Sequence, residues 1–542
     1  MHGLTIHFRL RFAVAVTLAA FLVLSLVARE SFAAKPRPAR EYVVQMKKGH
    51  AIAEGRRLVA KLHGQVTTPE LPVINGFGAM LRGDDAKELS RRAGVARVTP
   101  NSDLAGEKKG ASSAFGRCPS VRLRPRPEPR ARSIGRPENP AKAIRRLGQP
   151  LQSVIGADAA WMRGVTGRGV GVAVVDTGVA GYLGDFSGAA GSRVTASVVT
   201  NPCASDADDH VGHGTHVAGL IAGNSLGLGG PALSGRYMGV APEADVISVK
   251  VSDDGGDTTV LDVIYGLQFV VEHRRDLGIR VVNLSLASSV AESYRSDPLD
   301  AAAEAAWLAG VVVVTASGND GSASNAVSFA PGNDPFVITA GAIDDRGTSN
   351  PQDDGLPSWS SRGVTQDGFA KPEVLAPGSG LVATLAPGSS FAALCRDCAV
   401  GRTYLRLSGT SMATAVVSGT VALMLQHRPG LTPNQVKGTL VATARRVSGA
   451  GAVVNAAAAL DGNGLANTGL TPNSLIDPST GGIDWARASF RRASFRDAAG
   501  SPFGALWTRT SFRCDCGFDA SGEVDSARAS FRRVSFRGNY GF

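Results

Sequence analysis

Four residues in this chain have the types and local settings needed for covalent catalysis. Asp176 ends the apolar run VAVVD, His213 opens HGTHVAG, and Ser411 lies in GTSMA. These side chains offer a carboxylate, an imidazole and a hydroxyl, which can act as orienting acid, general base and nucleophile. Asn319, in SGND, adds a side-chain N–H donor for a developing oxyanion. The set predicts acyl transfer through a serine nucleophile.

The residues next to these side chains favour the same chemistry. Gly212 and Gly214 flank His213 and leave the approach to its imidazole clear. Ser411 opens SMATAVVSGTVALML, a stretch of small and apolar residues that predicts a helix. The first turn of a helix has backbone N–H groups without helical partners, and the helix dipole is positive there. We therefore expect a backbone N–H near Ser411 and the Asn319 amide to stabilise the oxyanion.

Each motif alone also has a purely structural interpretation. An aspartate after a strand is commonly a turn former, a histidine before a helix can cap or pack, and Gly-Thr-Ser can be an N-cap. All four motifs occur together, each with a specific flank, and this favours catalysis. His216, one helical turn after His213, fits the structural interpretation better, and we expect it to pack in the core.

The elements that must position these residues alternate between strand and helix. Two amphipathic stretches, 258–276 and 298–309, predict helices. Short apolar runs predict buried strands at 171–175, 246–251, 281–286, 311–316 and 336–341. This pattern is typical of a parallel sheet covered by helices on both faces, a three-layer α/β domain. Asp176, Ser285 and Asn319 fall at or just after strand ends, where such sheets bind ligands.

The N-terminus resembles an export signal. Arg9 and Arg11 precede an apolar run at 12–28, and small residues at 31–34 offer a cleavage site, so residues 1–34 are predicted to be a signal peptide. A retained membrane anchor is the alternative, although the run is shorter than the ~20 residues that span a bilayer. We expect a secreted protein.

Two segments separate the predicted signal from the catalytic motifs. Residues 41–104 show the order β-α-β-α-β, which predicts a small two-layer α+β domain within 35–104. Residues 105–150 are rich in Pro and Arg and predict a solvated linker. Residues 117–146 hold ten Lys/Arg against two Glu, so most of the net charge of +11 comes from this segment. No basic helix or aromatic-basic face indicates nucleic-acid binding.

Cysteine usage fits an oxidising compartment. The six cysteines comprise two close pairs and two isolated residues: Cys395 with Cys398, Cys514 with Cys516, Cys118 and Cys203. A zinc site would need four ligands at workable spacing, and the two pairs lie far apart in the sequence. An exported chain favours disulfides, whose connectivity stays open at this point.

The C-terminal segment, 461–542, carries an internal repeat. Arg-x-Ser-Phe-Arg occurs five times, at 487–491, 492–496, 509–513, 528–532 and 533–537. Its five-residue period matches neither a helix nor a strand, so we expect weak or induced structure. The arginines could attach the protein to an anionic cell surface through phosphate or carboxylate groups. The alternative is a flexible tail that is trimmed during maturation.

The motifs resemble those of the subtilase (subtilisin-like, S8) family of serine peptidases over residues 155–445. The matching stretches are GVAVVDTGV, GHGTHVAGLIAG, GVAPEADVISVKV, SGNDG, SSRG, KPEVLAPG and SGTSMATA. The resemblance implies that Asp176, His213 and Ser411 form the catalytic triad, that Asn319 is the oxyanion donor, and that catalysis needs no cofactor. It also implies that 35–104 is an inhibitory prodomain that assists folding and is removed by self-cleavage.

Two departures from the family pattern stand near the expected site. Ala415 replaces a proline that is tolerated in a first helical turn, so we expect the nucleophile to stay in place. Ala287 replaces a glycine in the strand expected to bind substrate, and its methyl group could narrow a substrate pocket. Extended polypeptides would add as a strand along Ser285, Leu286 and Ala287, with Gly318 opposite.

Two acidic features have a functional and a structural interpretation. Asp320, beside Asn319, could lie at the rim of the pocket for the residue before the scissile bond (P1) and favour a basic side chain there, or it could be a solvated turn residue. The family often holds structural calcium, and a loop carrying Asp206, Asp208 and Asp209 offers oxygen ligands. Such acidic loops are also common without a metal.

The sequence thus predicts a secreted serine endopeptidase made as a self-processing precursor. Its expected parts are a signal at 1–34, a prodomain at 35–104, a linker at 105–150, a peptidase domain at 151–460 and a repeat tail at 461–542. A surface-binding protein that keeps the fold without turnover is the alternative, and four intact catalytic residues argue against it. An esterase is a third candidate, but no G-x-S-x-G elbow surrounds Ser411.

Overall fold

A computed structural model of the protein describes residues 39–47, 49–67, 76–100, 139–201, 203–226, 232–288, 291–395, 397–447, 451–474 and 476. The predicted signal peptide, most of the predicted linker and the Arg-x-Ser-Phe-Arg repeats lie outside the described residues. So do Cys118, Cys514 and Cys516.

The N-terminal part forms a small α+β domain with the order β-α-β-β-α-β, which adds one short strand, β2, to the expected β-α-β-α-β. Its antiparallel sheet has the order β2-β3-β1-β4 and carries two helices. The elements are β1 (Arg40–Met46), α2 (Ile52–Lys61), β2 (Gln65–Val66), β3 (Gly76–Leu81), α3 (Gly83–Leu89) and β4 (Val95–Pro100). Val44, Val59, Phe77 and Leu89 are fully buried between the sheet and the helices. This domain therefore has its own hydrophobic core.

The large domain is built on a nine-stranded sheet whose neighbouring strands are parallel, except for the antiparallel pair at one edge. In sheet order the strands are β19 (Arg445–Val447), β20 (Gly451–Val453), β15 (Val374–Pro377), β12 (Ile338–Ile343), β11 (Val312–Ala316), β10 (Ile279–Leu284), β5 (Gly171–Asp176), β9 (Asp245–Lys250) and β8 (Val194–Val199). All residues of β5 are buried, as a strand covered on both faces requires. The five predicted strands are confirmed, two of them with bounds shifted by two residues.

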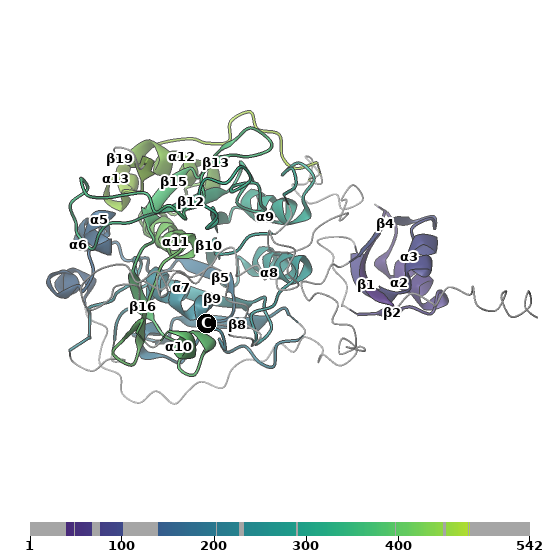
Figure 1. The fold of residues 1–542 in the computed structure, drawn as a ribbon, viewed down its shortest axis with the longest axis horizontal. Helices are drawn as coiled ribbons and strands as arrows, with labels where there is room; N and C mark the ends of the chain where they lie inside the picture. Colours follow the sequence, from purple (N-terminus) through teal and green to yellow (C-terminus); the bar gives the residue numbers. More distant parts are fainter. Residues whose placement is uncertain are drawn as a thin grey trace, which may run out of the picture.

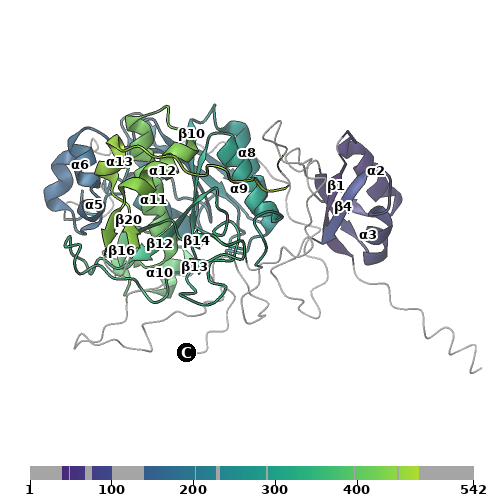
Figure 2. The same ribbon diagram turned by 90° about the horizontal axis from the view of Figure 1, so that it is seen from above.

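Helices cover both faces of this sheet (Figure 2). On one face α7 (His213–Ala222) packs against α11 (Thr410–His427), and on the other α8 (Val260–His273) packs against α9 (Pro298–Leu308). Thr259 and Asp262 form a capping box that begins α8, and Asp297 caps α9 ahead of Pro298. In both views the small domain, in purple, lies on the side of α8 and α9 (Figures 1 and 2). The three-layer α/β prediction is confirmed.

Two segments at the domain boundaries differ from expectation. Residues 139–150 fall in the predicted linker, but α4 (Pro140–Ala143) forms there because Asn139 caps it and Ala143 is fully buried. The chain also continues to pack after α13 (Ala456–Asp461), inside the predicted tail. Asn473 is 1% exposed, and its side chain donates to the carbonyls of Tyr294 and Asp297, just before α9. Polar contacts hold the second segment, and the first packs through a short apolar set (Ala143, Ile144 and Leu147), so hydrophobic periodicity did not reveal them.

Within the described part of the chain, no helix has both the length and the apolar character that crossing a bilayer requires.

Candidate active site

Asp176 and His213 form a buried pair at the carboxyl end of the sheet. Asp176 is the last residue of β5, and His213 is the first residue of α7. The His213 Nδ1–H donates to Asp176 Oδ1 over 2.6 Å, and both side chains are 0% exposed. Burial raises the pKa of Asp176, while the neighbouring His213 and the Thr177 amide act to lower it. Because Nδ1 is bonded to the carboxylate, Nε2 is the ring nitrogen that can accept a proton.

Thr177 and Asp209 fix the start of α7 to the end of β5. Thr177 Oγ1 donates to Asp209 Oδ1 over 2.8 Å and accepts from the Gly214 amide over 2.9 Å. The Asp209 carboxylate also accepts from the Gly212 and Thr215 amides over 2.7 and 2.8 Å. These bonds satisfy backbone donors in the first turn of α7, as an N-terminal cap does. The imidazole of His213 is thereby held in a defined place relative to Asp176.

Gly212 and Gly214 have a steric role beside His213. Gly212 has φ 102°, in the left-handed region that favours glycine. A side chain on Gly214 would collide with the Gly178 carbonyl oxygen, and its Cβ would lie 3.1 Å from Asp176 Oδ1. The short distance between α7 and the turn after β5 therefore depends on glycine.

Ser411 lies in the first turn of α11 and contacts the end of β10. The Ser285 Oγ–H donates to the Ser411 carbonyl over 3.1 Å, and the Ser411 Oγ–H donates to the Ser285 carbonyl over 3.5 Å. Asn283 Nδ2 donates to Ser285 Oγ over 2.8 Å, and its Oδ1 accepts from Ser418 over 2.9 Å. This buried network joins the helix of the predicted nucleophile to the strand predicted to bind substrate.

Asn319 is fixed against the same end of α11. Its Oδ1 accepts from the Thr410 amide and from the Thr410 hydroxyl, each over 3.0 Å. The Nδ2 group therefore points to the other side of the amide, as an oxyanion donor requires. Gly318 next to it has φ 101°, which allows the turn after β11 to bring Asn319 to this position. The structure thus brings Asn319 and Ser411 to the same helix N-terminus.

The remaining residues of the predicted site lie close by. Leu286 is fully buried, and Ala287 is 5% exposed. Ala415 is fully buried one turn after Ser411, and α11 continues through it without interruption. Asp320 is exposed, and its amide donates to Ser361 Oγ over 2.9 Å. The alanine in place of proline therefore leaves the helix intact.

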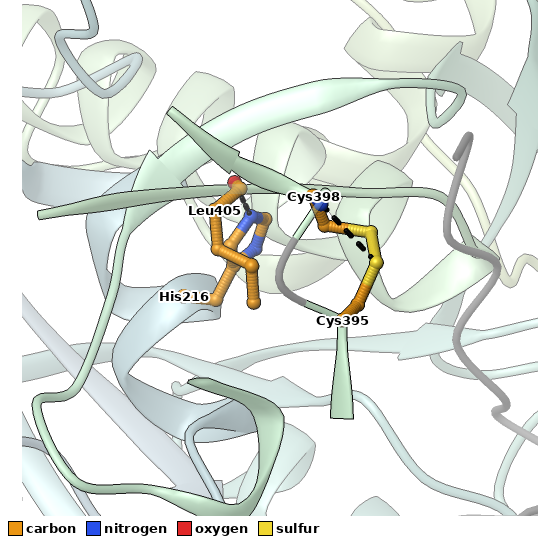
Figure 3. The surroundings of a disulfide bond; sticks show 4 residues. All are labelled: His216, Cys395, Cys398 and Leu405. Atoms are coloured by element: carbon orange, nitrogen blue, oxygen red, sulfur yellow. Dashed lines mark hydrogen bonds between the residues drawn. A yellow bond between two sulfur atoms is a disulfide. The ribbon is translucent and has the colours of Figure 1, made fainter. Parts of the chain in front are cut away.

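His216 packs in the core, as predicted. It is fully buried, and its Nε2 bonds to the Leu405 carbonyl over 2.9 Å (Figure 3). Burial lowers the pKa of His216 to about 3, because the loss of solvation of its charged form outweighs the bond to the Leu405 carbonyl, which acts to raise it. A neutral imidazole with this pKa is unsuited to general base catalysis near pH 7.

The acidic loop before α7 does not match an oxygen cage for calcium. The Asp209 carboxylate accepts hydrogen bonds from the first turn of α7 and caps that helix. Asp206 Oδ1 accepts from the Asp208 amide over 2.8 Å. The buried Lys250 ammonium donates to Asp254 and to the Asp208 carbonyl, each over 2.7 Å. Asp206, His210 and Asp254 lie close enough to share an ion, but a ring nitrogen and an adjacent ammonium do not suit a cation that prefers oxygen ligands.

The sequence did not reveal several residues that support the site. Thr177 directly follows Asp176, Asp209 lies four residues before His213, and Asn283 lies two residues before Ser285. This closeness to the catalytic motifs was the only indication of their role that the sequence offered. Phe391 contacts the His213 ring edge-on, with the ring centroids 6.4 Å apart. It comes from a segment without any motif. Such partners depend on the folded path of the chain.

Comparisons with known proteins agree with this geometry. The model of the subtilase family, Peptidase_S8, matches residues 167–467. Serine protease AprX of Bacillus subtilis (strain 168) is 40% identical over 278 residues, which are 50% of this chain and 60% of AprX. Subtilisin Savinase of Lederbergia lenta is 36% identical over 294 residues, which are 54% of this chain and 89% of that protein.

A solved structure shares the fold. Fervidolysin from Fervidobacterium pennivorans superposes with a TM-score of 0.55 at 24% identity, covering 79% of this chain and 62% of fervidolysin. The family match covers more than half of the chain and includes all four predicted catalytic positions. The chain belongs to the subtilase family of serine peptidases.

Proposed function

We propose that the protein is a secreted serine endopeptidase that hydrolyses polypeptides through an acyl-enzyme. One observation carries the proposal: a buried 2.6 Å bond joins His213 Nδ1 to Asp176, at the end of the sheet where α7 contacts α11 and Ser411 lies in the first turn of α11. This arrangement fixes the tautomer in which Nε2 is a base, and it provides a serine hydroxyl at a helix N-terminus. Relatives named as serine protease and subtilisin support the same reaction class.

The proposed mechanism assigns one role to each group. The Ser411 hydroxyl attacks the peptide carbonyl carbon while His213 Nε2 accepts its proton, and Asp176 stabilises the imidazolium. Asn319 Nδ2 and a backbone N–H of the first turn of α11 donate to the oxyanion. His213 then gives the proton to the leaving amine, and the same sequence with water releases the acyl group. These steps need no cofactor.

We propose that substrates bind as extended strands along residues 284–287, opposite Gly318. The buried network from Ser418 to Ser285 supports this, because it fixes the backbone of the strand relative to Ser411. Exposed Asp320 would favour a basic P1 residue. A peptide-library profile that excludes Lys and Arg at P1 would remove this preference.

We also propose a precursor organisation: signal at 1–34, inhibitory prodomain at 35–104, linker at 105–150, peptidase domain at 151–460 and tail at 461–542. To these bounds we add the packed residues 139–150, 462–474 and 476. The separate hydrophobic core of the small domain supports a removable unit. Attachment of the repeats to an anionic cell surface predicts that deleting 483–542 releases the enzyme from the cell fraction.

The central experiment compares the wild-type precursor with Ser411→Ala in a host without peptidases. We expect a fluorophosphonate probe to label the wild type at Ser411 and the variant not at all. The wild type should shed residues 35–104, whereas the variant should keep them. Thr420→Val is the matched control, because it removes a buried hydroxyl of the same helix that donates to the Val416 carbonyl, and this variant should still be labelled. Equal processing of wild type and Ser411→Ala would refute self-cleavage, and a wild type that no probe labels would refute the catalytic assignment.

A further inference from the structure

A short segment before β18 (Tyr404–Leu407) lies directly on the loop that carries the catalytic histidine. It contains α10 (Ser390–Leu394), capped by Ser389. The Ser390 amide donates to the His210 carbonyl over 2.9 Å, and the Phe391 amide donates to the Val211 carbonyl over 3.0 Å. Two backbone bonds thus join this segment to the residues immediately before His213.

Phe391 is the side chain that reaches the imidazole. Its ring meets the His213 ring edge-on, at an interplanar angle of 83°, and the residue is 5% exposed. Gly212 makes this contact feasible, since a Cβ there would lie 2.6 Å from Ser389 Oγ and 3.2 Å from Phe391 Cβ. The segment therefore fits closely against the backbone on the N-terminal side of His213.

A disulfide closes the same segment at its other end (Figure 3). Cys395 and Cys398 are bonded to each other, and the Cys398 amide donates to Cys395 Sγ over 3.2 Å. The Cys398 carbonyl accepts from the Arg406 amide over 2.8 Å, which joins the closed turn to β18. Leu405, the residue before Arg406 in β18, accepts the bond from His216 on α7. The segment is therefore fixed at both ends against elements that contact the first two turns of α7.

We propose that residues 389–395, 397 and 398, closed by the Cys395–Cys398 disulfide, form a clamp in which Phe391 is a positioning residue for the catalytic His213. This inference rests on the proposed function, because it assigns a role in the same reaction. The bond to Asp176 fixes one nitrogen of the imidazole, and rocking of the ring about this bond is the movement that would misalign it. The Phe391 ring blocks that movement and excludes water from one edge of the imidazole. Small displacements of a catalytic group can cost as much as about 100-fold in rate.

The first test removes the ring in the full-length protein. Phe391→Ala should lower kcat by about 10- to 100-fold with KM within about twofold, because orientation and not substrate binding is lost. Water reaching the imidazole should stabilise its charged form, so the acid limb of the kcat/KM profile should move to higher pH. Phe391→Leu, which keeps an apolar side chain, should restore most of both properties.

The matched control is Phe336→Ala, which removes a ring of equal exposure, 5%, from the core beside α12 (Pro433–Thr443). Phe336→Ala should leave the acid limb of the kcat/KM profile at the same pH as in the wild type. If Phe391→Ala and Phe336→Ala change kcat and the acid limb equally, or if Phe391→Ala changes neither, the clamp is refuted.

The second test opens the disulfide. A dithiol reductant transfers two electrons and two protons to the Cys395–Cys398 bond and becomes a cyclic disulfide. The reduced wild type should show the same lower kcat as Cys395→Ser/Cys398→Ser, and the double variant should not respond to reductant. Cys203 is disulfide-bonded too, so the reductant can also act on its disulfide. A double variant whose kcat does not respond to reductant shows that the loss in the wild type comes from the Cys395–Cys398 bond. A double variant with wild-type kcat and an unmoved acid limb would refute the role of the disulfide.

A spectroscopic readout separates this inference from the proposed function. The His213 Nδ1 proton bonded to Asp176 should give a downfield NMR resonance, and Phe391→Ala should speed its exchange with water while Phe336→Ala does not. This measurement requires no turnover. A wild type without hydrolytic activity would refute the proposed function, whereas equal exchange in the wild type and Phe391→Ala would refute the clamp.

Discussion

The two histidines of α7 stand three residues apart, and both are fully buried, yet their surroundings differ. His213 donates to the carboxylate of Asp176, and His216 bonds to the uncharged carbonyl of Leu405. Burial, with a further contribution from the nearby His213, lowers the pKa of His216 to about 3 and keeps it neutral. Asp176 instead places a carboxylate beside His213, and a neighbouring carboxylate is the group that stabilises an imidazolium. The hydrogen-bond partner of a buried histidine therefore matters more than its depth of burial for whether the ring can act as a base.

Removing the charge of Asp176 should do most to make the surroundings of His213 resemble those of His216. Asp176→Asn should lower kcat by about 10,000-fold, because an amide favours the wrong tautomer of His213 and cannot stabilise the imidazolium. Steady-state kinetics on a peptide substrate measures the effect. Asp334→Asn, at another fully buried carboxylate, should change kcat by less than about threefold. Similar losses in both variants would mean that Asp176 acts only through the fold.

The contribution of Asn319 to oxyanion stabilisation can be tested in the same way. Asn319→Ala should lower kcat by about 100- to 1,000-fold with little change in KM, the magnitude known for the oxyanion asparagine of subtilisin. Thr410→Val keeps the amide but removes one of the two donors that orient it, so its effect should be smaller. A Thr410→Val loss equal to that of Asn319→Ala would show that orientation of the amide decides the whole effect.

Substitutions of Thr177 test whether catalysis depends on the hydrogen bonds that fix the N-terminus of α7 near His213. Thr177→Val deprives the Gly214 amide of its acceptor and Asp209 of a donor, at a cost of about 1–3 kcal/mol. Displacement of His213 should then lower kcat by about tenfold, as single-turnover measurements would show. Thr177→Ser keeps the hydroxyl and should retain nearly full activity. A loss in Thr177→Ser as large as in Thr177→Val would point to the methyl group instead.

His216 should affect stability and leave turnover almost unchanged. Its pKa falls from an ordinary 6.5 to about 3 in the folded state. Between these values the unfolded chain binds a proton that the folded chain does not, so stability falls as the pH drops, by about 1.4 kcal/mol per pH unit.

His216→Gln removes this titration. Denaturant unfolding between pH 7 and pH 4 should therefore show a shallower acid loss of stability than in the wild type. The kcat at pH 8 should stay within about threefold of the wild-type value. A large fall in kcat with an unchanged acid slope would reverse the roles assigned to the two histidines.

The sequence predicted the parts of the site that depend on local motifs. Asp176, His213, Asn319 and Ser411 stand in short segments whose chemistry is evident without coordinates. The parallel sheet followed from apolar runs that are buried on both faces. The shift of two residues in β10 was not predictable, because Ser285 leaves the sheet to bond with Ser411.

Contacts between segments distant in the sequence were beyond prediction. Asp209 looked like a metal ligand because acidic loops have this appearance, but its carboxylate caps α7. Phe391 had no signal, since its contact with His213 joins positions 178 residues apart. The packed segment around Asn473 follows polar bonds to Tyr294 and Asp297, which no periodicity in the sequence indicates.

That last contact has a practical consequence for shortening the chain. The Asn473 amide donates to the carboxylate of Glu304, whose pKa burial raises to about 10. A truncation at residue 461 would strip this acid of its donor and expose the side of α9 that the segment covers. A stop codon placed after Ile476, which is 5% exposed, would spare both. Expression plasmids designed to lack the repeats should therefore end there, and fusion partners should be joined downstream of the same position.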